Sequence, residues 1–433
     1  MTVSRRGMFR GVGIGAAAVA GSALTAGVAR ADGGRGSKGG GRGRGLRTGA
    51  DVAAADQWRV FSGRKVGVIT NPTGVLEDFT SIVDDMVARG VDVGAVFGPE
   101  HGFRGTAQAG ESEETFVDPR TGVTVYDAYG ANVAKFAGFF TESGVDTVVF
   151  DIRDVGARFY TYIWTMWTAM QAASQVGIAF VVLDRPNPLG GRARGPVLQE
   201  GFSSGVGVLE IAQQHGMTVG ELARFFNGVF MERAGQVPLA DLDVIEVRGW
   251  RREMVGPDQA DRWIPPSPNM PTPQTATIYP GTGMFESTNF SEGRGTTRPF
   301  ELIGAPYVDH QWAAALNERG LKGVEFREAY FVPTFSKNQG QVCAGVQVHL
   351  IDEEKVDAIA VATHMLVEAR DLYEGFDWRG DGGRWIDLLT GSDRFRTQFE
   401  AGASAEEIIE AWQPELQQFV KDTRGYLLYP GPR

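Results

Sequence analysis

The stretch DTVVFDIRDVGARFYTYIWTMWTAMQAASQVGIAFVVLDRPN, residues 146–187, contains two apolar runs that flank one helical pattern. Residues 146–150 and 178–183 are short and almost continuously apolar, which predicts strands that are buried on both faces. Between them, residues 163–175 are long enough and apolar enough to form a helix that packs against those strands. The stretch therefore predicts a strand–helix–strand unit of a parallel sheet.

The same alternation continues on both sides of this stretch. Further strands are predicted at 65–70, 91–97 and 123–126, and helices at 79–89 and 131–143. This repetition predicts an α/β fold with a Rossmann-like, doubly wound parallel sheet at residues 49–195. From residue 196 to 433 the pattern is mixed and predicts a second, smaller α+β C-terminal domain. Its expected elements are helices at 217–230 and 356–373, strands at 242–247 and 341–351, and a last helix after a capping box at 404–407.

The first 48 residues are predicted to direct export. Arg5-Arg6 precede an apolar stretch rich in Gly, Ala and Val, and Ala29-Arg30-Ala31 then forms a small-x-small cleavage pattern. These elements in this order are typical of a twin-arginine signal peptide, predicted at 1–31. The Gly- and Arg-rich residues 32–48 predict a flexible linker. The mature protein is thus expected outside the cytoplasm, extracellular or at the cell wall or periplasm, without a membrane partner after signal removal.

The composition argues against several partners and cofactors. The net charge is −11 although the first 47 residues are strongly basic, so the rest is strongly acidic and no nucleic acid is expected. Cys343 is the one cysteine, which excludes an internal disulfide, and the five histidines lack metal-binding spacing. The first predicted strand is followed by Asn71-Pro72-Thr73-Gly74 and not by a Gly-x-Gly-x-x-Gly turn, which argues against a dinucleotide. We therefore expect no metal and no organic cofactor.

Polar and ionisable residues follow four of the predicted strands. They are Asn71, the pair Glu100 and His101, residues 151–154 and residues 184–187. In open α/β sheets, ligands bind beyond the carboxyl ends of the strands. The sequence therefore predicts a functional site at this edge of the sheet.

A Pro-rich passage at residues 263–296 is predicted to be a long, stiff loop of the C-terminal domain. Gly293 and Gly295 allow the backbone to turn tightly around Arg294. Long ordered loops in compact domains are usually functional. Glu292 in this loop and Glu100 at the sheet edge would supply the two carboxyl groups that glycoside hydrolysis usually needs. Aromatic residues that could stack on sugar rings lie close by in the sequence: Phe103, Tyr160, Tyr162, Trp164, Phe285 and Phe290.

Two other classes of function remain open on these residues. An exported sugar-binding protein without catalysis would need hydrogen-bonding and stacking groups but no catalytic acid. A serine esterase or amidase would use Ser203 within Gly-Phe-Ser-Ser-Gly, residues 201–205. A nucleophile elbow requires a helix after the serine, and residues 206–208 do not resemble a helix start.

Four sequence blocks resemble the exo-β-N-acetylmuramidase family of glycoside hydrolases. They are GPEHGFRG at 98–105, DIRDVGARFYTY at 151–162, DRPNP at 184–188 and EGRGT at 292–296, and the resemblance extends over about residues 50–433. It implies hydrolysis of terminal N-acetylmuramic acid from the non-reducing end of peptidoglycan fragments. It also implies a site in the cleft between a Rossmann-like domain and a smaller C-terminal domain.

The resemblance also implies roles for individual residues. The Glu-His pair of the family corresponds to Glu100 and His101, which we predict to be catalytic. The resemblance does not assign the second catalytic carboxylate; we infer that it is Glu292, with Glu286, Asp151 and Asp154 as alternatives. N-Acetylmuramic acid carries a lactyl carboxylate, for which an arginine is the best-suited partner. The predicted substrate-binding residues are Arg104, Asp151, Arg153, Arg158, Tyr160, Tyr162, Asn269, Glu286, Asn289 and Arg294.

Overall fold

A computed structural model of the chain describes residues 45–105, 113–256, 263–380 and 382–431. The predicted signal peptide and most of the predicted linker lie outside these residues. The last residues of the predicted linker belong to the fold: Arg47 pairs with Arg248 through two backbone hydrogen bonds, and Thr48 caps helix α1 (Gly49–Ala55). Among the described residues, no helix combines the length and the apolar character that crossing a membrane requires.

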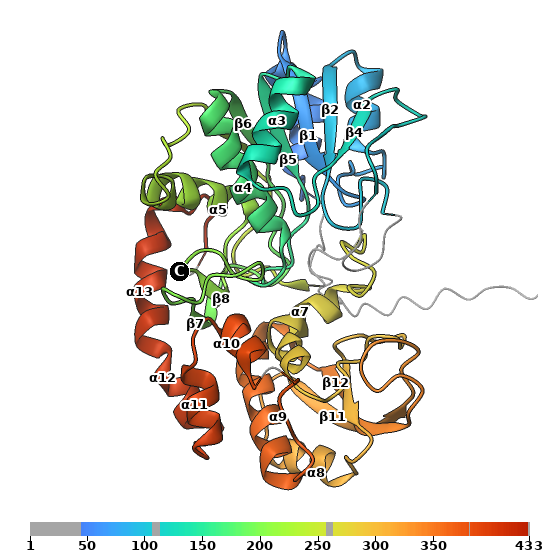
Figure 1. Cartoon of the computed structure of the whole chain (residues 1–433), viewed down its shortest axis with the longest axis vertical. Coiled ribbons are helices and arrows are strands. Elements are labelled where there is room, and N and C mark those ends of the chain that lie inside the picture. Colours follow the sequence, from blue (N-terminus) through green and yellow to red (C-terminus); the bar gives the residue numbers. More distant parts are fainter. Residues whose placement is uncertain (1–44, 106–112, 257–262, 381, 432–433) are drawn as a thin grey trace, which may run out of the picture. The chain divides into compact units, whose positions relative to one another are not determined.

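The main sheet has seven strands in the order β3-β4-β2-β1-β5-β6-β9. Figure 1 labels β4, β2, β1, β5 and β6 of this sheet. All neighbouring pairs are parallel except β3 with β4, which is antiparallel at one edge. The predicted α/β fold with a mostly parallel sheet is therefore confirmed. The strands are β1 (Lys65–Thr70), β2 (Asp92–Gly98), β3 (Phe116–Val117), β4 (Thr124–Asp127), β5 (Thr147–Asp151), β6 (Ala179–Leu183) and β9 (Leu242–Ile245).

Helices cover both faces of this sheet, which explains why its strands are so apolar. In β5, Val148 and Phe150 pack in a core with α3 (Val133–Ser143) and α4 (Tyr162–Val176), whereas Val149 packs in a second core with α1 and α2 (Ile82–Ala88). Successive strand side chains point to opposite faces, so both alternate sets must be hydrophobic here. The helix predicted at 79–89 begins only at Ile82, because Phe79 has a left-handed φ of 67° and lies in the preceding turn.

The main sheet draws strands from both sides of the predicted boundary between residues 195 and 196. Strand β9 follows that boundary in the sequence, yet it pairs in parallel with β6. The helix predicted at 217–230 is α5 (Val219–Phe225), continued by a π-helical turn at Phe226–Phe230 and by the short α6 (Met231–Arg233). Two short strands, β7 (Arg194–Val197) and β8 (Ala212–Gln214), form a separate antiparallel pair.

A second, antiparallel sheet has the order β10-β12-β11 and carries its own hydrophobic core. Its strands are β10 (Leu302–Ala305), β11 (Val324–Phe331) and β12 (Cys343–Leu350). Helices α8 (Gln311–Glu318) and α9 (Ala358–Leu372) contribute Trp312, Ile359 and Met365 to this core. Cys343 is buried here, as its apolar strand pattern suggests.

The Pro-rich passage is not one continuous loop, and this part of the prediction was wrong. Residues Pro273–Thr282 form helix α7, whose N-cap Thr272 accepts a hydrogen bond from the backbone of Thr275. Proline is well tolerated in the first helical turn, because the N–H it lacks would have no partner there. Pro273 thus begins helix α7, and the prolines before it stiffen the preceding segment. A 3₁₀ turn, Gly283–Ser287, follows directly.

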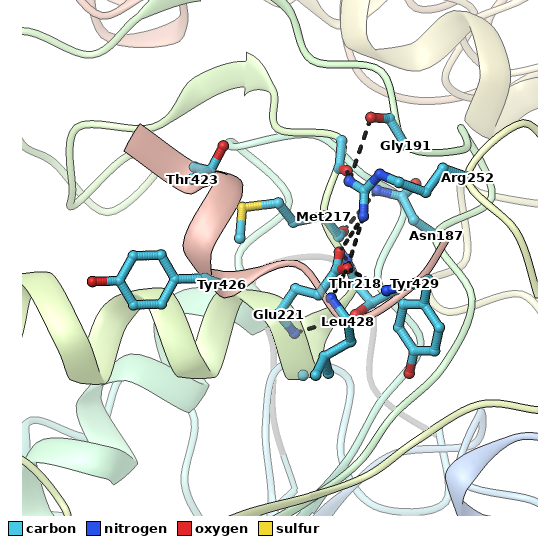
Figure 2. A network of polar contacts seen from close by, with 12 residues as sticks. Asn187, Gly191, Met217, Thr218, Glu221, Arg252, Thr423, Tyr426, Leu428 and Tyr429 are labelled. Carbon is cyan, nitrogen blue, oxygen red and sulfur yellow. Dashed lines mark hydrogen bonds and ion pairs between the residues drawn. The ribbon is translucent and has the colours of Figure 1, made fainter. Parts of the chain in front are cut away.

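The C-terminal region is helical and ends against the main sheet. It comprises α10 (Arg384–Thr390), α11 (Arg394–Glu400), α12 (Ala405–Ala411) and α13 (Gln413–Thr423). The predicted capping box at Ser404 and Glu407 is confirmed, but the predicted last helix is divided at Trp412. After α13, the backbone N–H of Leu428 donates to Glu221, which Arg252 also contacts (Figure 2).

Candidate active site

The turn after β2 presents Glu100 next to the start of α4. The Thr161 hydroxyl lies 3.4 Å from a Glu100 carboxylate oxygen, and the Tyr162 hydroxyl lies 3.5 Å from the Glu100 carbonyl oxygen. Glu100 is partly exposed, whereas His101 is only 6 % exposed. His101 has a left-handed φ of 72°, a conformation that most side chains avoid and that is common near functional sites. The sheet edge thus exposes the predicted acid on a sharply turned backbone.

The segment before α7 packs over this edge of the sheet. The carbonyl oxygen of Pro266 accepts hydrogen bonds from Tyr162, at 2.8 Å, and from Asn71, at 3.4 Å. Asn71 follows β1 and Tyr162 begins α4, so these contacts bring the first part of the Pro-rich passage against the end of β1 and the start of α4. Asn269, a predicted substrate-binding residue, is half-buried in the same segment.

A row of aromatic rings connects the sheet edge to the second half of the chain. The ring centroids of Tyr162 and Tyr160 are 5.4 Å apart, those of Tyr160 and Tyr279 are 5.9 Å apart, and those of Tyr279 and Phe300 are 4.7 Å apart. The Arg294 guanidinium then stacks on Phe300 at 5.0 Å. All four rings are nearly fully buried. Edge-to-face packing of this kind is favourable and holds the rings in defined positions.

At the far end of this row, two glutamates surround Arg294. A nitrogen of Arg294 lies 2.7 Å from Glu286 and its Nε lies 3.2 Å from Glu292. Lys337 Nζ forms an ion pair with the other Glu292 oxygen at 2.9 Å, although without hydrogen-bond geometry. Burial alone would lower the pKa of Arg294, but Glu286 and Glu292 outweigh it and raise that pKa. Glu292 is 2 % exposed, so it is a buried carboxylate held between two cations.

Charged groups from both halves of the chain affect the pKa of Tyr279 in α7. Burial raises the pKa of Tyr279 well above its ordinary value, and the carboxylates of Glu286, Glu100 and Asp154 raise it further. Arg294 acts in the opposite direction. The Tyr279 ring packs edge-to-face against both Tyr160 and Phe300. A continuous series of contacts therefore connects Glu100, through Tyr279 and its neighbouring rings, to Arg294 and its partner Glu286.

Sequence reasoning did not identify Tyr279 or Lys337. Tyr279 lies in a passage that was predicted to be a loop, and its position on α7 depends on a helix that begins with proline. Lys337 lies between β11 and β12, where no local pattern marks it, and it also donates to the carbonyl oxygens of Phe285 and Thr288. Only the pairing of distant segments gives these residues their neighbours.

Three predicted site residues are held in contacts within the fold. Arg158 is fully buried, and its guanidinium donates to the carbonyl oxygens of Pro196, Ile211 and Leu389. Asp151 is fully buried and accepts two hydrogen bonds from Arg185. Asn289 binds the segment that includes Gly375 and Asp377. These hydrogen bonds connect distant parts of the chain. They use most of the hydrogen-bonding capacity of each side chain, so little remains for a ligand.

Asp154 and Arg104 are also paired with other side chains. His215 accepts from the backbone of Met217 through Nδ1, so its Nε2 donates to Asp154 at 3.0 Å. Arg104 donates to Asp84 at 3.0 Å and to Asp118 at 2.8 Å. Arg153 differs from both, because its guanidinium stacks on the Trp263 ring at 5.3 Å.

The described residues contain no cluster of three or more His, Cys, Asp or Glu side chains that could hold a metal ion. The Ser203 hydroxyl donates to the carbonyl oxygen of Val208, and the short β-bridge between Ser204 and Gly207 follows it where an elbow would have a helix. The esterase geometry is therefore absent from this described segment.

Family models of known proteins match most of the chain. Residues 66–274 match the N-terminal domain of exo-beta-N-acetylmuramidase NamZ, and residues 277–429 match its C-terminal domain. The chain is 44 % identical over 388 residues to the peptidoglycan beta-N-acetylmuramidase NamZ of Bacillus subtilis strain 168, covering 89 % of this chain and 91 % of that protein.

Two crystal structures of DUF1343 family proteins from Bacteroides fragilis NCTC 9343 have a similar fold. One has a TM-score of 0.79 at 32 % identity and the other a TM-score of 0.70 at 30 % identity. Each comparison covers 89 % of this chain and 99 % of the solved chain. The chain therefore belongs to the exo-beta-N-acetylmuramidase NamZ family and is a glycoside hydrolase.

Proposed function

We propose that this protein is a secreted exo-β-N-acetylmuramidase that removes terminal N-acetylmuramic acid from the non-reducing end of peptidoglycan fragments. The name of the Bacillus subtilis relative supports the substrate class. The observation that carries the proposal is the buried row of rings that leads from Tyr162, beside Glu100, to Phe300, on which Arg294, the partner of Glu286, stacks. Glycoside hydrolysis usually uses two carboxyl groups around the scissile bond, and in this proposal each half of the chain supplies one.

In this proposal Glu100 is the general acid that protonates the leaving oxygen. It follows a strand, is partly exposed and has a threonine hydroxyl beside it. An acid in this position would contribute about 10²–10⁴-fold to the rate. His101 is adjacent but nearly buried, which suits a residue that orients the turn or binds one substrate hydroxyl.

Glu292 and Glu286 are the two candidates for the second catalytic carboxylate. Glu292 was the predicted partner, but two cations contact it and its side chain is 3 % exposed. The side chain of Glu286 is 20 % exposed and shares Arg294 with it. A base or nucleophile must reach water or the sugar, which favours Glu286, with Glu292 positioning Arg294 and Lys337. Glu286→Gln should then reduce kcat at least as strongly as Glu292→Gln.

The test of the reaction uses a chromogenic N-acetylmuramic acid glycoside beside the matching N-acetylglucosamine glycoside. We expect rapid cleavage of the first and slow cleavage of the second. End-labelled peptidoglycan fragments should lose single terminal muramic acid residues, as the exo mode requires. Binding of the glycoside without any product would support the sugar-binding alternative and contradict the proposal.

Export rests on the N-terminal residues, which lie outside the described part. Replacement of Arg5-Arg6 by Lys-Lys should trap the protein in the cell with its signal attached, because the arginine pair is read by the export receptor. Secretion of this variant at the normal rate would contradict the twin-arginine route.

A further inference from the structure

Arg153 is a half-buried cation just beyond the end of β5, and it has an unusual shortage of partners. Its Nε is buried and has no hydrogen-bond partner among the described residues. Its guanidinium lies over the Trp263 ring, 5.3 Å from the centroid. A flat guanidinium stacked on an indole keeps its edge free to bind a planar anion in the bidentate manner.

The other arginines of the four sequence blocks are already engaged. Arg104 is bound by two aspartates, Arg294 by two glutamates, and Arg158 by three backbone carbonyl oxygens. A buried arginine normally has such compensation, since an unpaired buried charge is costly. Within the described residues, Arg153 has no ion pair of this kind, so its charge is left for something else to neutralise.

The surroundings of Arg153 border the proposed active site. Its backbone N–H donates to Thr73, in the turn after β1. Trp263, on which it stacks, belongs to the segment whose Pro266 carbonyl accepts from Tyr162. The Tyr162 hydroxyl in turn lies 3.5 Å from the Glu100 carbonyl oxygen. A short series of contacts therefore connects the cation to the proposed acid.

The charges around Arg153 favour the binding of an anion. Burial and the neighbouring Arg185 lower the pKa of Arg153 to about 10, and Asp151 only partly opposes this. The group is still charged at neutral pH. Asp151 does not neutralise it directly, because both of its oxygens bind Arg185. A carboxylate bound at Arg153 would neutralise its positive charge.

We infer that Arg153, stacked on Trp263, binds the lactyl carboxylate of the substrate and so selects muramic acid over glucosamine. This inference rests on the proposed function. N-Acetylmuramic acid differs from N-acetylglucosamine by a lactyl ether that ends in a carboxylate, and a guanidinium is the best-suited partner for that group. Arg153 is accordingly a specificity-determining residue that touches the substrate and not the scissile bond.

The test compares Arg153→Met with Arg153→Lys, which have similar length but differ in charge. Each is assayed on a muramic acid glycoside and on the same glycoside with its lactyl carboxylate converted to a neutral methylamide. In Arg153→Met, KM for the acid should rise roughly 10- to 100-fold, the scale of one lost charge-assisted contact, while values for the amide change little. Arg153→Lys should retain part of the preference for the acid. The matched control is Arg233→Met, which removes an arginine stacked on Phe230 outside the proposed site.

The outcomes separate this inference from the proposed function. If the wild type cleaves neither glycoside, the proposed function fails. If the wild type prefers the acid and Arg153→Met keeps that preference, only the assignment of Arg153 is overturned. A loss of activity that is equal on acid and amide, with unchanged thermal unfolding, would also overturn it, because a lost carboxylate contact must affect the acid alone.

Discussion

At the scale of single residues, burial distinguishes the polar side chains that hold the fold together from those that can reach a ligand. Glu292, Asp151 and Arg158 are almost completely buried. Glu292 forms ion pairs with Arg294 and Lys337, Asp151 binds Arg185 through both oxygens, and Arg158 donates to three backbone carbonyl oxygens. Glu100 and Arg153 are partly exposed at the same sheet edge. A side chain can act on a ligand only if the ligand can reach it, which the exposure of Glu100 and Arg153 allows and the burial of the other three prevents. This reasoning separates structural from functional members of the same sequence blocks.

The principal prediction at this scale concerns Glu100→Gln. The amide retains the shape of the side chain but cannot deliver a proton. We expect kcat to fall by about 10²-fold or more on substrates with poor leaving groups, with little change in KM. A nitrophenyl glycoside needs less protonation and should be affected less. Glu318→Gln, on the exposed end of α8, is the control. Equal losses on good and poor leaving groups would contradict the acid role.

At the scale of elements, α7 determines where Tyr279 and the following loop lie. Gly281 permits this helix to approach α9 closely, because a Cβ at that position would lie 1.8 Å from the carbonyl oxygen of Ala358. A helix with two prolines and little amphipathic pattern owes its position to such packing and not to intrinsic propensity.

Gly281→Ala should therefore destabilise the protein by about 1–3 kcal/mol, the usual cost of overpacking a contact. Chemical denaturation followed by circular dichroism measures the change. Gly138→Ala is the matched control, since Gly138 lies in α3 with open space around its Cα. That change should be neutral or stabilise by up to about 1 kcal/mol, as alanine favours helix over glycine. Equal effects of the two substitutions would show that the α7–α9 contact does not require glycine.

At the scale of the whole molecule, the last residues of the chain return to the main sheet. The Tyr429 hydroxyl donates to Asp184, which follows β6, and it accepts from the backbone of Val247. Figure 2 shows Leu428 beside Glu221 and Arg252, which form a buried ion pair. Burial raises the pKa of Asp184 to about 7, while the Tyr429 hydroxyl and other donors oppose that rise. The C-terminus is thus tied to the sheet through a carboxyl group that titrates near neutrality.

This arrangement predicts a pH-dependent effect of Tyr429→Phe. Because the folded pKa of Asp184 is above its unfolded value, this group's contribution to stability falls as pH rises from about 4 to 7. Above that range Asp184 is ionised and the Tyr429 hydroxyl stabilises the charge. Tyr429→Phe should therefore reduce the free energy of unfolding more at pH 8 than at pH 5, by about 1 kcal/mol. Denaturation of both proteins at the two pH values measures this difference, and an equal loss at both would contradict it.

The sequence alone determined the parallel sheet, because strands buried on both faces must be apolar on both faces, as residues 148–150 and 179–183 are. It also indicated the sheet edge that carries Glu100, since polar residues after parallel strands converge there. It could not determine that residues 273–282 are helical, nor that Tyr279 and Lys337 join the site, because those depend on contacts between distant segments. The sequence also could not distinguish Arg153, which stacks on Trp263, from Arg158, which binds three backbone carbonyl oxygens. The burial and the contacts of a side chain are properties of the folded chain, and local sequence does not encode them.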